Sequence, residues 1–364
     1  MTNKQILNKI LQTLEKEHIN LYHDVSKEEI LKHIESIDGL NEMSDTQFNL
    51  EMLKLFALFK DAHTWYGTPY IPVDKQLTYI RGKYYILDKD LWKEIFSFGK
   101  LKASEMYKKL EPLIGYETKE WLCHTIKRSI NNAYTYKLLG LNDGDKLELT
   151  LKDGTKLELN KQNIENKESN KIKVPYSYKL LDGDILYVRY ESCWEDDKYP
   201  FVAFAKDVAK VVDDKKINDY ILDLRGNTGG NSEILNPFQD LVKDKKLKGV
   251  LLIDNGVFSS GRFAVARFKK EFNTPLIGEP TGGPAKAYGY LKRLEVEGKK
   301  FSASIRLWDF SDIFGYEGAI QPDILVENCI ENIQNHKDMA LKTAVDYINK
   351  TKTKNKNNDT ELAY

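Results

Sequence analysis

An alternation of apolar strands and helical segments after Pro175 constrains the fold of this chain more than any other feature. Runs such as Tyr220–Leu224 and Val250–Ile253 are almost continuously apolar, which is typical of strands covered on both faces. Helical segments are expected at 200–213, 232–242 and 260–272, and a further apolar strand follows the last of them. This order predicts an α/β core over residues 176–350.

Three other regions surround the predicted core. Residues 1–65 have the pattern of amphipathic helices, with capping boxes at Ser26–Glu29 and Ser44–Gln47. One helix face there carries Phe48, Met52, Phe56 and Phe59. Residues 66–175 mix helices and strands and include a hairpin whose turn is Asp153–Gly154. The polar segment 351–364 predicts a solvated tail.

Composition excludes several classes of protein. Lys plus Arg and Asp plus Glu are both 55, so the charge balance predicts neither a nucleic-acid partner nor an anionic membrane. No apolar run approaches the length of a membrane span. The 3 cysteines have neither disulfide-framework nor zinc-site spacing, which indicates a reducing, cytoplasmic compartment. Export after removal of a signal peptide stays an alternative.

Three loops rich in small residues follow the apolar strands, at Arg225–Gly230, Phe258–Gly261 and Gly278–Pro284. Because loops at the carboxyl ends of neighbouring strands line one crevice, we expect these loops to converge on a single site. Glycines there allow backbone amides to point at a ligand oxygen, although glycine pairs also serve as simple turns. The loops match no nucleotide-binding motif, so no cofactor is predicted.

Ser259 and His63 are the candidate catalytic pair. Ser259 lies between a strand and a helix, a placement in which a hydroxyl projects as a nucleophile, although the same placement suits a helix N-cap. A serine nucleophile needs a base. Of the 6 histidines, His63 is the one that directly follows a helix end. His18 and His23 lack a metal-binding spacing, so no metal site is predicted.

Together these segments resemble the C-terminal processing and tricorn-type serine peptidases, also called tail-specific proteases. Residues 221–230, ILDLRGNTGG, resemble the D-L-R-x-N-x-G-G block of that family, and Val257–Gly261 falls on its nucleophile turn. Ile277–Gly283 matches its G-E-x-T-x-G segment, and Gln321–Ile324 its closing P-D motif. The resemblance is convincing over about 180–326 and implies a ClpP/crotonase-like layering of sheet and helices.

The family uses two kinds of base, and the resemblance favours histidine. Asp61–Thr64 matches the D-x-H-T run of the histidine style, which gives His63 the role of base for Ser259. In the other style a lysine follows the G-E-x-T-x-G segment. Pro284 occupies that position here, and Lys286, two residues on, stays the alternative base.

The resemblance also implies the remaining groups of the site. The backbone amides of Gly229 and Ser260 would form the oxyanion hole. A glutamate near the closing P-D motif would orient the histidine, and Glu317 is the nearest match. Asp309 and Asp312 are alternative acids, and a site without an acid is a further alternative.

The implied activity is that of a serine endopeptidase that hydrolyses protein or peptide substrates through an acyl-enzyme intermediate, without a cofactor. Arg262 stands where an acid is common in the family. That departure keeps open a catalytically silent peptide-binding or scaffolding protein on the same fold. Residues 66–175 resemble the degenerate PDZ-like part of such proteins. A second copy of the chain, in a homo-oligomer, stays open as a partner.

Overall fold

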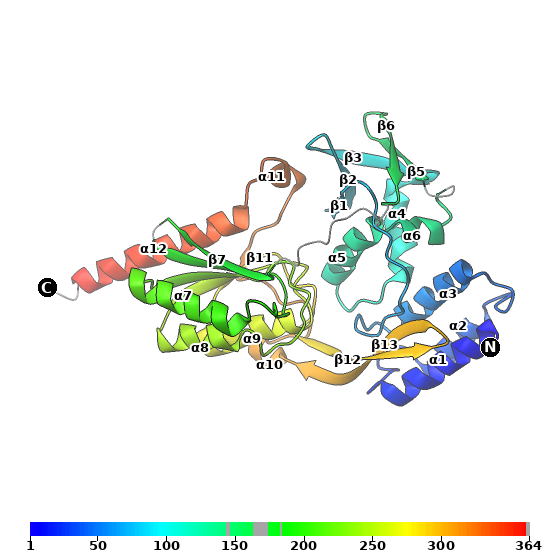
Figure 1. The fold of residues 1–364 in the computed structure, drawn as a ribbon, viewed down its shortest axis with the longest axis horizontal. Coiled ribbons are helices and arrows are strands. Elements are labelled where there is room, and N and C mark those ends of the chain that lie inside the picture. Colours follow the sequence, from blue (N-terminus) through cyan, green and yellow to red (C-terminus); the bar gives the residue numbers. More distant parts are fainter. Residues whose placement is uncertain (143–145, 163–173, 183, 362–364) are drawn as a thin grey trace. The chain divides into compact units, whose positions relative to one another are not determined.

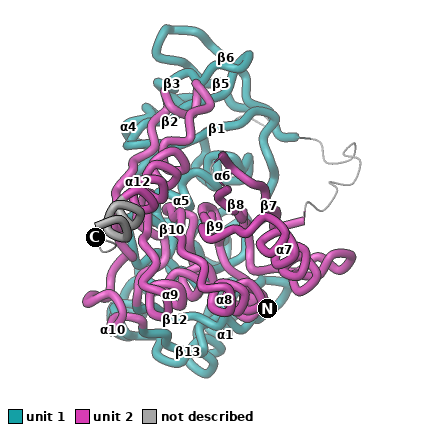
Figure 2. The backbone as a smooth tube through the Cα atoms, turned by 90° about the vertical axis from the view of Figure 1, so that its left-hand side faces the viewer, with its two compact units in different colours: residues 1–167, 286–309 teal, residues 168–285, 310–364 magenta. Residues whose placement is uncertain are grey.

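The chain folds into two compact units, each with its own hydrophobic core (Figure 1). The computed structural model describes residues 1–142, 146–162, 174–182 and 184–361, with side chains up to residue 353. Unit 1 comprises residues 1–167 and 286–309, and unit 2 comprises residues 168–285 and 310–364 (Figure 2). Both units are therefore built from two separate stretches of sequence.

Unit 1 begins with three helices, α1 (Asn3–Glu17), α2 (Lys27–Glu35) and α3 (Asp45–Leu58). The predicted capping boxes at Ser26–Glu29 and Ser44–Gln47 are confirmed, and Thr2 with Gln5 forms a third. The predicted apolar face of α3 is buried at all four positions, Phe48, Met52, Phe56 and Phe59. These helices end at the loop that carries His63.

The middle of unit 1 is an antiparallel sheet flanked by helices. Its strands are β1 (Leu77–Ile80), β2 (Lys83–Asp88), β3 (Leu91–Phe98), β4 (Leu101–Lys102), β5 (Lys146–Leu151) and β6 (Lys156–Asn160), in the order β1-β2-β3-β5-β6 with β4 on β3. The helices are α4 (Ala103–Leu110), the short η1 (Glu111–Leu113), α5 (Lys119–Ile130) and α6 (Ala133–Leu138). The predicted hairpin at Asp153–Gly154 joins β5 to β6.

A long hairpin, β12 (Lys286–Val296) and β13 (Lys299–Asp309), completes unit 1. Its buried residues Val296, Phe301 and Ala303 join the core formed by α1, α2 and α3. The sequence pattern places these residues in the 176–350 region, and nothing in that pattern indicates that they fold back onto the N-terminal helices. Their apolar side chains find a partner surface there because the helices present a complementary apolar face.

Unit 2 is built on a six-stranded sheet in the order β14-β11-β10-β9-β8-β7. The strands are β7 (Tyr176–Leu181), β8 (Ile185–Tyr190), β9 (Asp219–Asp223), β10 (Lys248–Ile253), β11 (Leu276–Gly278) and β14 (Ile324–Leu325). Strand β7 pairs antiparallel with β8, and the other pairs are parallel. The predicted α/β core is thereby confirmed, with one antiparallel edge.

Helices cover both faces of this sheet, as its apolar strands require. They are α7 (Phe201–Lys215), α8 (Asn236–Asp244), α9 (Ser260–Phe272), the short α10 (Ser311–Phe314) and α11 (Ile330–Gln334), and α12 (Met339–Glu361). Helices α7, α8 and α9 share one core, whereas Ala340, Ala344 and Ile348 of α12 pack on the opposite face. Helix α12 continues well into the segment that the sequence predicts as a solvated tail. In the described part of the chain, no helix has both the length and the apolar character of a membrane span.

Candidate active site

Ser259 occupies a strained turn between β10 and α9. Its backbone angles are φ 47° and ψ −122°, a conformation that residues other than glycine rarely adopt. Its side chain makes no capping hydrogen bond to α9, so the alternative of a simple N-cap finds no support. Strain of this kind persists only where the surroundings enforce it, and it is concentrated at functional sites.

The glycine-rich loop after β9 lies directly against this turn. A Cβ atom at Gly229 would come within 2.7 Å of both the Ser259 Cβ and the Ser260 amide nitrogen, and Gly229 itself has φ +105°. The Phe258 amide donates to the Asn227 carbonyl at 3.0 Å. Only glycine allows this approach of the two loops.

The predicted oxyanion donors differ in their surroundings. The amide of Gly229 donates to Asn227 Oδ1 at 2.9 Å, and Asn227 is buried, its own Nδ2 donating to the Tyr190 carbonyl at 3.0 Å. A substrate oxyanion would therefore compete with Asn227 for the Gly229 donor. Ser260 is the first residue of α9, and its hydroxyl donates to the Gly230 carbonyl at 2.6 Å. Its amide belongs to the first turn, where helical N–H groups have no intrahelical acceptor.

The third predicted loop also contacts the turn that carries Ser259, so the expected convergence of the three loops is confirmed. The Gly283 amide donates to the Val257 carbonyl at 3.0 Å. Arg262 in α9 is buried, donates to the Pro284 carbonyl, and lies 5.8 Å from the centre of the Phe310 ring. Arg262 therefore connects α9 to this loop.

In unit 1, a buried carboxylate fixes the loop that carries His63. Asp61 Oδ1 accepts the His63 backbone amide at 2.8 Å, and Oδ2 accepts the Thr64 hydroxyl at 2.7 Å and His18 Nε2 at 2.9 Å. Because the Asn20 amide donates to His18 Nδ1 at 2.9 Å, the proton of the neutral His18 ring lies on Nε2. No sequence motif connects His18 with this site.

The electrostatics of Asp61 follow from these contacts. Burial disfavours its ionised form, but the hydrogen bond from His18 and the charge of the nearby His63 outweigh burial. Together they hold the pKa of Asp61 well below its usual range. Asp61 is thus a charged acceptor at neutral pH and a rigid anchor for the backbone of His63.

The His63 ring lies beside a second acid that sequence reasoning missed, Glu117. One side-chain nitrogen or oxygen from each of Asp61, His63 and Glu117 lies within 4.8 Å of the other two. A position suitable for zinc needs ligand atoms about 2.0–2.2 Å from the ion. Both oxygens of Asp61 already accept hydrogen bonds within the protein, so we assign no metal ion to this group.

The remaining predicted site residues are divided between the units. Lys286 and Asp309 face each other at the open end of the β12–β13 hairpin, 3.7 Å apart, in unit 1. Ser259, Asp312 and Glu317 belong to unit 2, where both acids are exposed. His63 belongs to unit 1, so its pairing with Ser259, and the role of Glu317, stay predictions.

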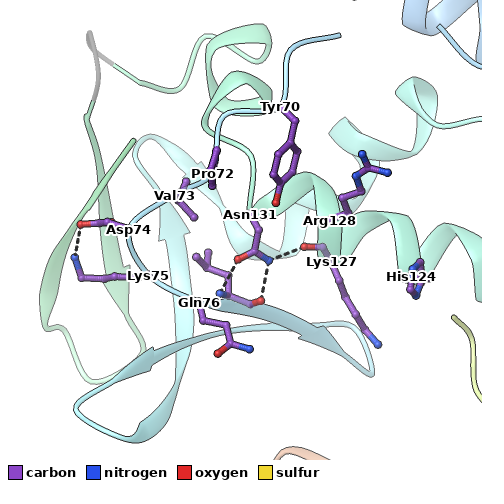
Figure 3. Close-up of a pocket in the computed structure, with 11 residues that line it drawn as sticks. Tyr70, Pro72, Val73, Asp74, Lys75, Gln76, His124, Lys127, Arg128 and Asn131 are labelled. Carbon is purple, nitrogen blue, oxygen red and sulfur yellow. Dashed lines mark hydrogen bonds and ion pairs between the residues drawn. The ribbon is translucent and has the colours of Figure 1, made fainter. Parts of the chain in front are cut away.

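A cavity of about 590 Å³ lies in the middle of unit 1, between residues 70–77 and helix α5 (Figure 3). Asn131 is one of the residues that line it, and its side chain bonds to the backbone of Leu77 and Lys127. The Arg128 guanidinium lies 5.5 Å from the centre of the Tyr70 ring. This is the region for which the sequence suggests a degenerate PDZ-like part.

A cavity of about 620 Å³ lies in unit 2 near the ends of β9, β10 and β11. Four of its charged lining residues pair with one another: Asp223 lies 2.6 Å from Arg225 and 3.5 Å from Arg189, and Arg225 lies 2.7 Å from Asp338. Neither cavity is lined by Ser259 or His63. Cavity size alone therefore does not locate the candidate active site.

Comparison with known proteins supports the fold. The sequence matches no protein-family model, and no curated protein matches it. The structure is similar to that of mature CPAF complexed with lactacystin, with a TM-score of 0.60, 12% identity, and coverage of 96% of this chain and 98% of that chain. A mutant of CPAF gives a TM-score of 0.62 at 10% identity, covering 91% and 94%. A candidate peptidase from Parabacteroides merdae gives 0.53 at 14% identity, covering 95% and 96%. The chain thus has the tail-specific protease fold that its motifs imply.

Proposed function

We propose that this chain is a serine endopeptidase in which Ser259 is the nucleophile. The observation that carries the proposal is the strained backbone of Ser259 at the start of α9, with the glycine loop packed against it. A hydroxyl presented in this way stands beside backbone amides that can stabilise an oxyanion. The shared fold adds support, since proteins with this architecture include peptidases.

The proposed reaction uses groups of this chain alone. His63 accepts the proton of the Ser259 hydroxyl while Oγ attacks the carbonyl carbon of the scissile bond. The amides of Ser260 and Gly229 hold the resulting oxyanion, the latter after releasing or sharing its bond to Asn227. The C–N bond then breaks, and the departing amine takes the proton from His63. Water then attacks the acyl carbon while His63 takes its proton, the bond from that carbon to Oγ breaks, and His63 returns the proton to the Ser259 oxygen.

Labelling with a fluorophosphonate tests the nucleophile. We expect the wild-type chain to gain one phosphonyl group on Ser259 by intact mass and peptide mapping. Ser259→Ala is expected to lose both labelling and hydrolysis of a fluorogenic peptide mixture, with stability changed by no more than ~1 kcal/mol. Ser232→Ala, which removes a hydroxyl of the same unit that donates to Glu233 at 3.2 Å, is the control and keeps both. Full turnover in Ser259→Ala contradicts the assignment.

The base is tested by substitution and pH. Lys286 faces the carboxylate of Asp309, an arrangement that favours a charged ammonium rather than a neutral base. We therefore expect His63→Ala to lose at least ~1,000-fold in kcat/KM and Lys286→Ala to stay within a few-fold of wild type. The acid limb of the wild-type profile is expected at about pH 6–7. An active His63→Ala beside an inactive Lys286→Ala would establish the lysine alternative.

A catalytically silent peptide-binding protein is the second candidate. The observation that favours it is the bond from the Gly229 amide to Asn227, which occupies a donor that catalysis needs. Peptide binding by the wild-type chain, with neither labelling of Ser259 nor turnover, is the result expected for this candidate.

A further inference from the structure

Residues 114–118, between η1 and α5, form a loop of unit 1 that no sequence motif connects with the site. This loop lies directly on the loop that carries His63. A Cβ atom at Gly115 would come within 3.1 Å of the Asp61 carbonyl oxygen, and Lys60 Nζ lies 4.7 Å from the centre of the Tyr116 ring. The two loops are thus in contact at two points, Gly115 with Asp61 and Tyr116 with Lys60.

Because these two loops pack against each other, the carboxylate of Glu117 lies close to His63. Both oxygens of Glu117 are buried from solvent, as is His63 Nδ1, and the His63 residue is only 3% exposed. A carboxylate oxygen of Glu117 lies no more than 4.8 Å from a ring nitrogen of His63. Thr118, the next residue, caps α5 by accepting the Trp121 amide at 3.1 Å, which fixes the backbone beside Glu117.

The two acids near the His63 imidazole, Asp61 and Glu117, are expected to have different roles. Asp61 is committed to the His63 backbone amide, to Thr64 and to His18. The side chain of Glu117 comes from a different element, the loop between η1 and α5. A carboxylate within about 4–6 Å of an imidazole favours the protonated ring. The ring becomes protonated when it takes a proton from a nucleophile.

We propose that Glu117 is the acid that positions His63 and stabilises its protonated ring, the role that the sequence resemblance gives to Glu317. It is a positioning residue, because it acts on substrate only through His63. Its consequence for catalysis rests on the proposed function, whereas its effect on the His63 ring does not. His63 Nδ1 is buried from solvent, and in the proposed function Nε2 is the nitrogen that exchanges the proton with Ser259.

Other charged and titratable groups surround this ring. Asp61 belongs to the same loop, and His18, stacked on His23 at a centroid distance of 6.3 Å, follows α1. On β12, Tyr288 lies 5.6 Å from His18 between ring centres, and a Cβ at its neighbour Gly289 would lie 3.5 Å from His63 Cε1. Arg306 on β13 pairs with Gly289 in register and is exposed, and Lys60 lies over Tyr116. All these groups are unchanged by substitution of Glu117.

Histidine-selective NMR of the full-length chain measures the effect directly, without substrate. The His63 signal is identified by its loss in His63→Gln, and its pKa is then followed in each variant. Glu117→Gln is expected to lower the pKa of His63 by about 1 unit, because a neutral amide no longer favours the protonated ring. Glu117→Asp keeps the charge and is expected to retain at least half of the effect. If Glu117→Gln does not fold, the His63 pKa in Glu117→Asp is compared with that of the wild type instead.

Two matched variants make the result specific. Glu120→Gln removes an acid from the first turn of α5 that lies 4.0 Å from Lys119, and Glu317→Gln removes the rival acid. Neither is expected to move the pKa of His63. An unchanged His63 pKa in Glu117→Gln, or a fall of that pKa in Glu317→Gln alone, overturns the proposal.

Activity separates this proposal from the proposed function. In an active enzyme, Glu117→Gln is expected to lower kcat by about 10- to 100-fold, to shift the acid limb downward and to leave KM nearly unchanged. A lowered His63 pKa in a chain that never labels at Ser259 contradicts the peptidase assignment and supports the pairing of Glu117 with His63.

Discussion

Replacement of Gly229 by alanine is expected to lower turnover by at least ~100-fold and to destabilise unit 2 by ~3 kcal/mol or more. The new Cβ would stand 2.7 Å from the Ser259 Cβ and from the Ser260 amide nitrogen, so the nucleophile turn must shift. A shift of about 1 Å is enough for such a loss in rate. The positive φ of Gly229 adds a backbone cost of ~1–3 kcal/mol. Chemical unfolding and peptide hydrolysis measure the two effects.

Gly226→Ala is the matched control for that prediction. Gly226 belongs to the same loop and also has a positive φ, +75°, but the nearest atom to its added Cβ would be the end of the Arg189 side chain, at 3.9 Å. This variant is expected to show the backbone cost without the loss of turnover. Equal turnover in Gly229→Ala and wild type would mean that the glycine loop does not define the nucleophile turn.

Replacement of Asp61 by asparagine is expected to lower the melting temperature at pH 7 by about 6–20 °C. The variant removes the charge that accepts bonds from His18, Thr64 and the His63 amide, and breaking a buried network of this kind costs ~3–5 kcal/mol. For a unit of this size, each 1 kcal/mol corresponds to about 2–4 °C. Turnover is expected to fall as well, since the backbone of His63 loses its anchor.

The same variant has a pH signature whose sign follows from the lowered pKa of Asp61. A carboxyl with a depressed folded-state pKa contributes stability above its unfolded value of about 4, and this contribution is lost as pH falls toward the folded-state pKa. The gap in melting temperature between wild type and Asp61→Asn is therefore expected to narrow below about pH 4. Asp38→Asn, at an exposed position of the same unit, is the control. A constant gap down to pH 2 would show that the charge of Asp61 is not what stabilises the loop.

The α/β core could be predicted because its physical signals are local. Apolar runs such as Val250–Ile253 and the small residues after each strand are contiguous in sequence. A short window of residues is therefore enough to recognise each strand and the loop that follows it. The hairpin β12–β13 could not be assigned to its unit in the same way. Its partner surface on α1, α2 and α3 lies more than 200 positions upstream, and no pattern within residues 286–309 names that partner.

The residues of the candidate site fall into the same two groups, those that stand in a local sequence motif and those that come from distant segments. Ser259 and Gly229 stand in contiguous motifs, and in the structure both have positive φ and the two loops pack against each other. Glu117 and His18 carry no motif, and only the stacking of separate loops brings them to Asp61 and His63. A signal was present in Asp61 itself, because a buried aspartate requires partners and some of them must come from distant segments.

The position of the β12–β13 hairpin in the chain determines when the surroundings of His63 are complete during synthesis. The His63 carbonyl accepts the Ser302 hydroxyl at 2.5 Å, and the Ser304 amide bonds to Thr64 Oγ1 at 3.3 Å. A ribosome makes these serines after Ser259 and after most of the sheet of unit 2. The loop that carries His63 therefore lacks these two contacts until Ser302 and Ser304 have been synthesised. The turn that carries Ser259 is synthesised before these contacts can form.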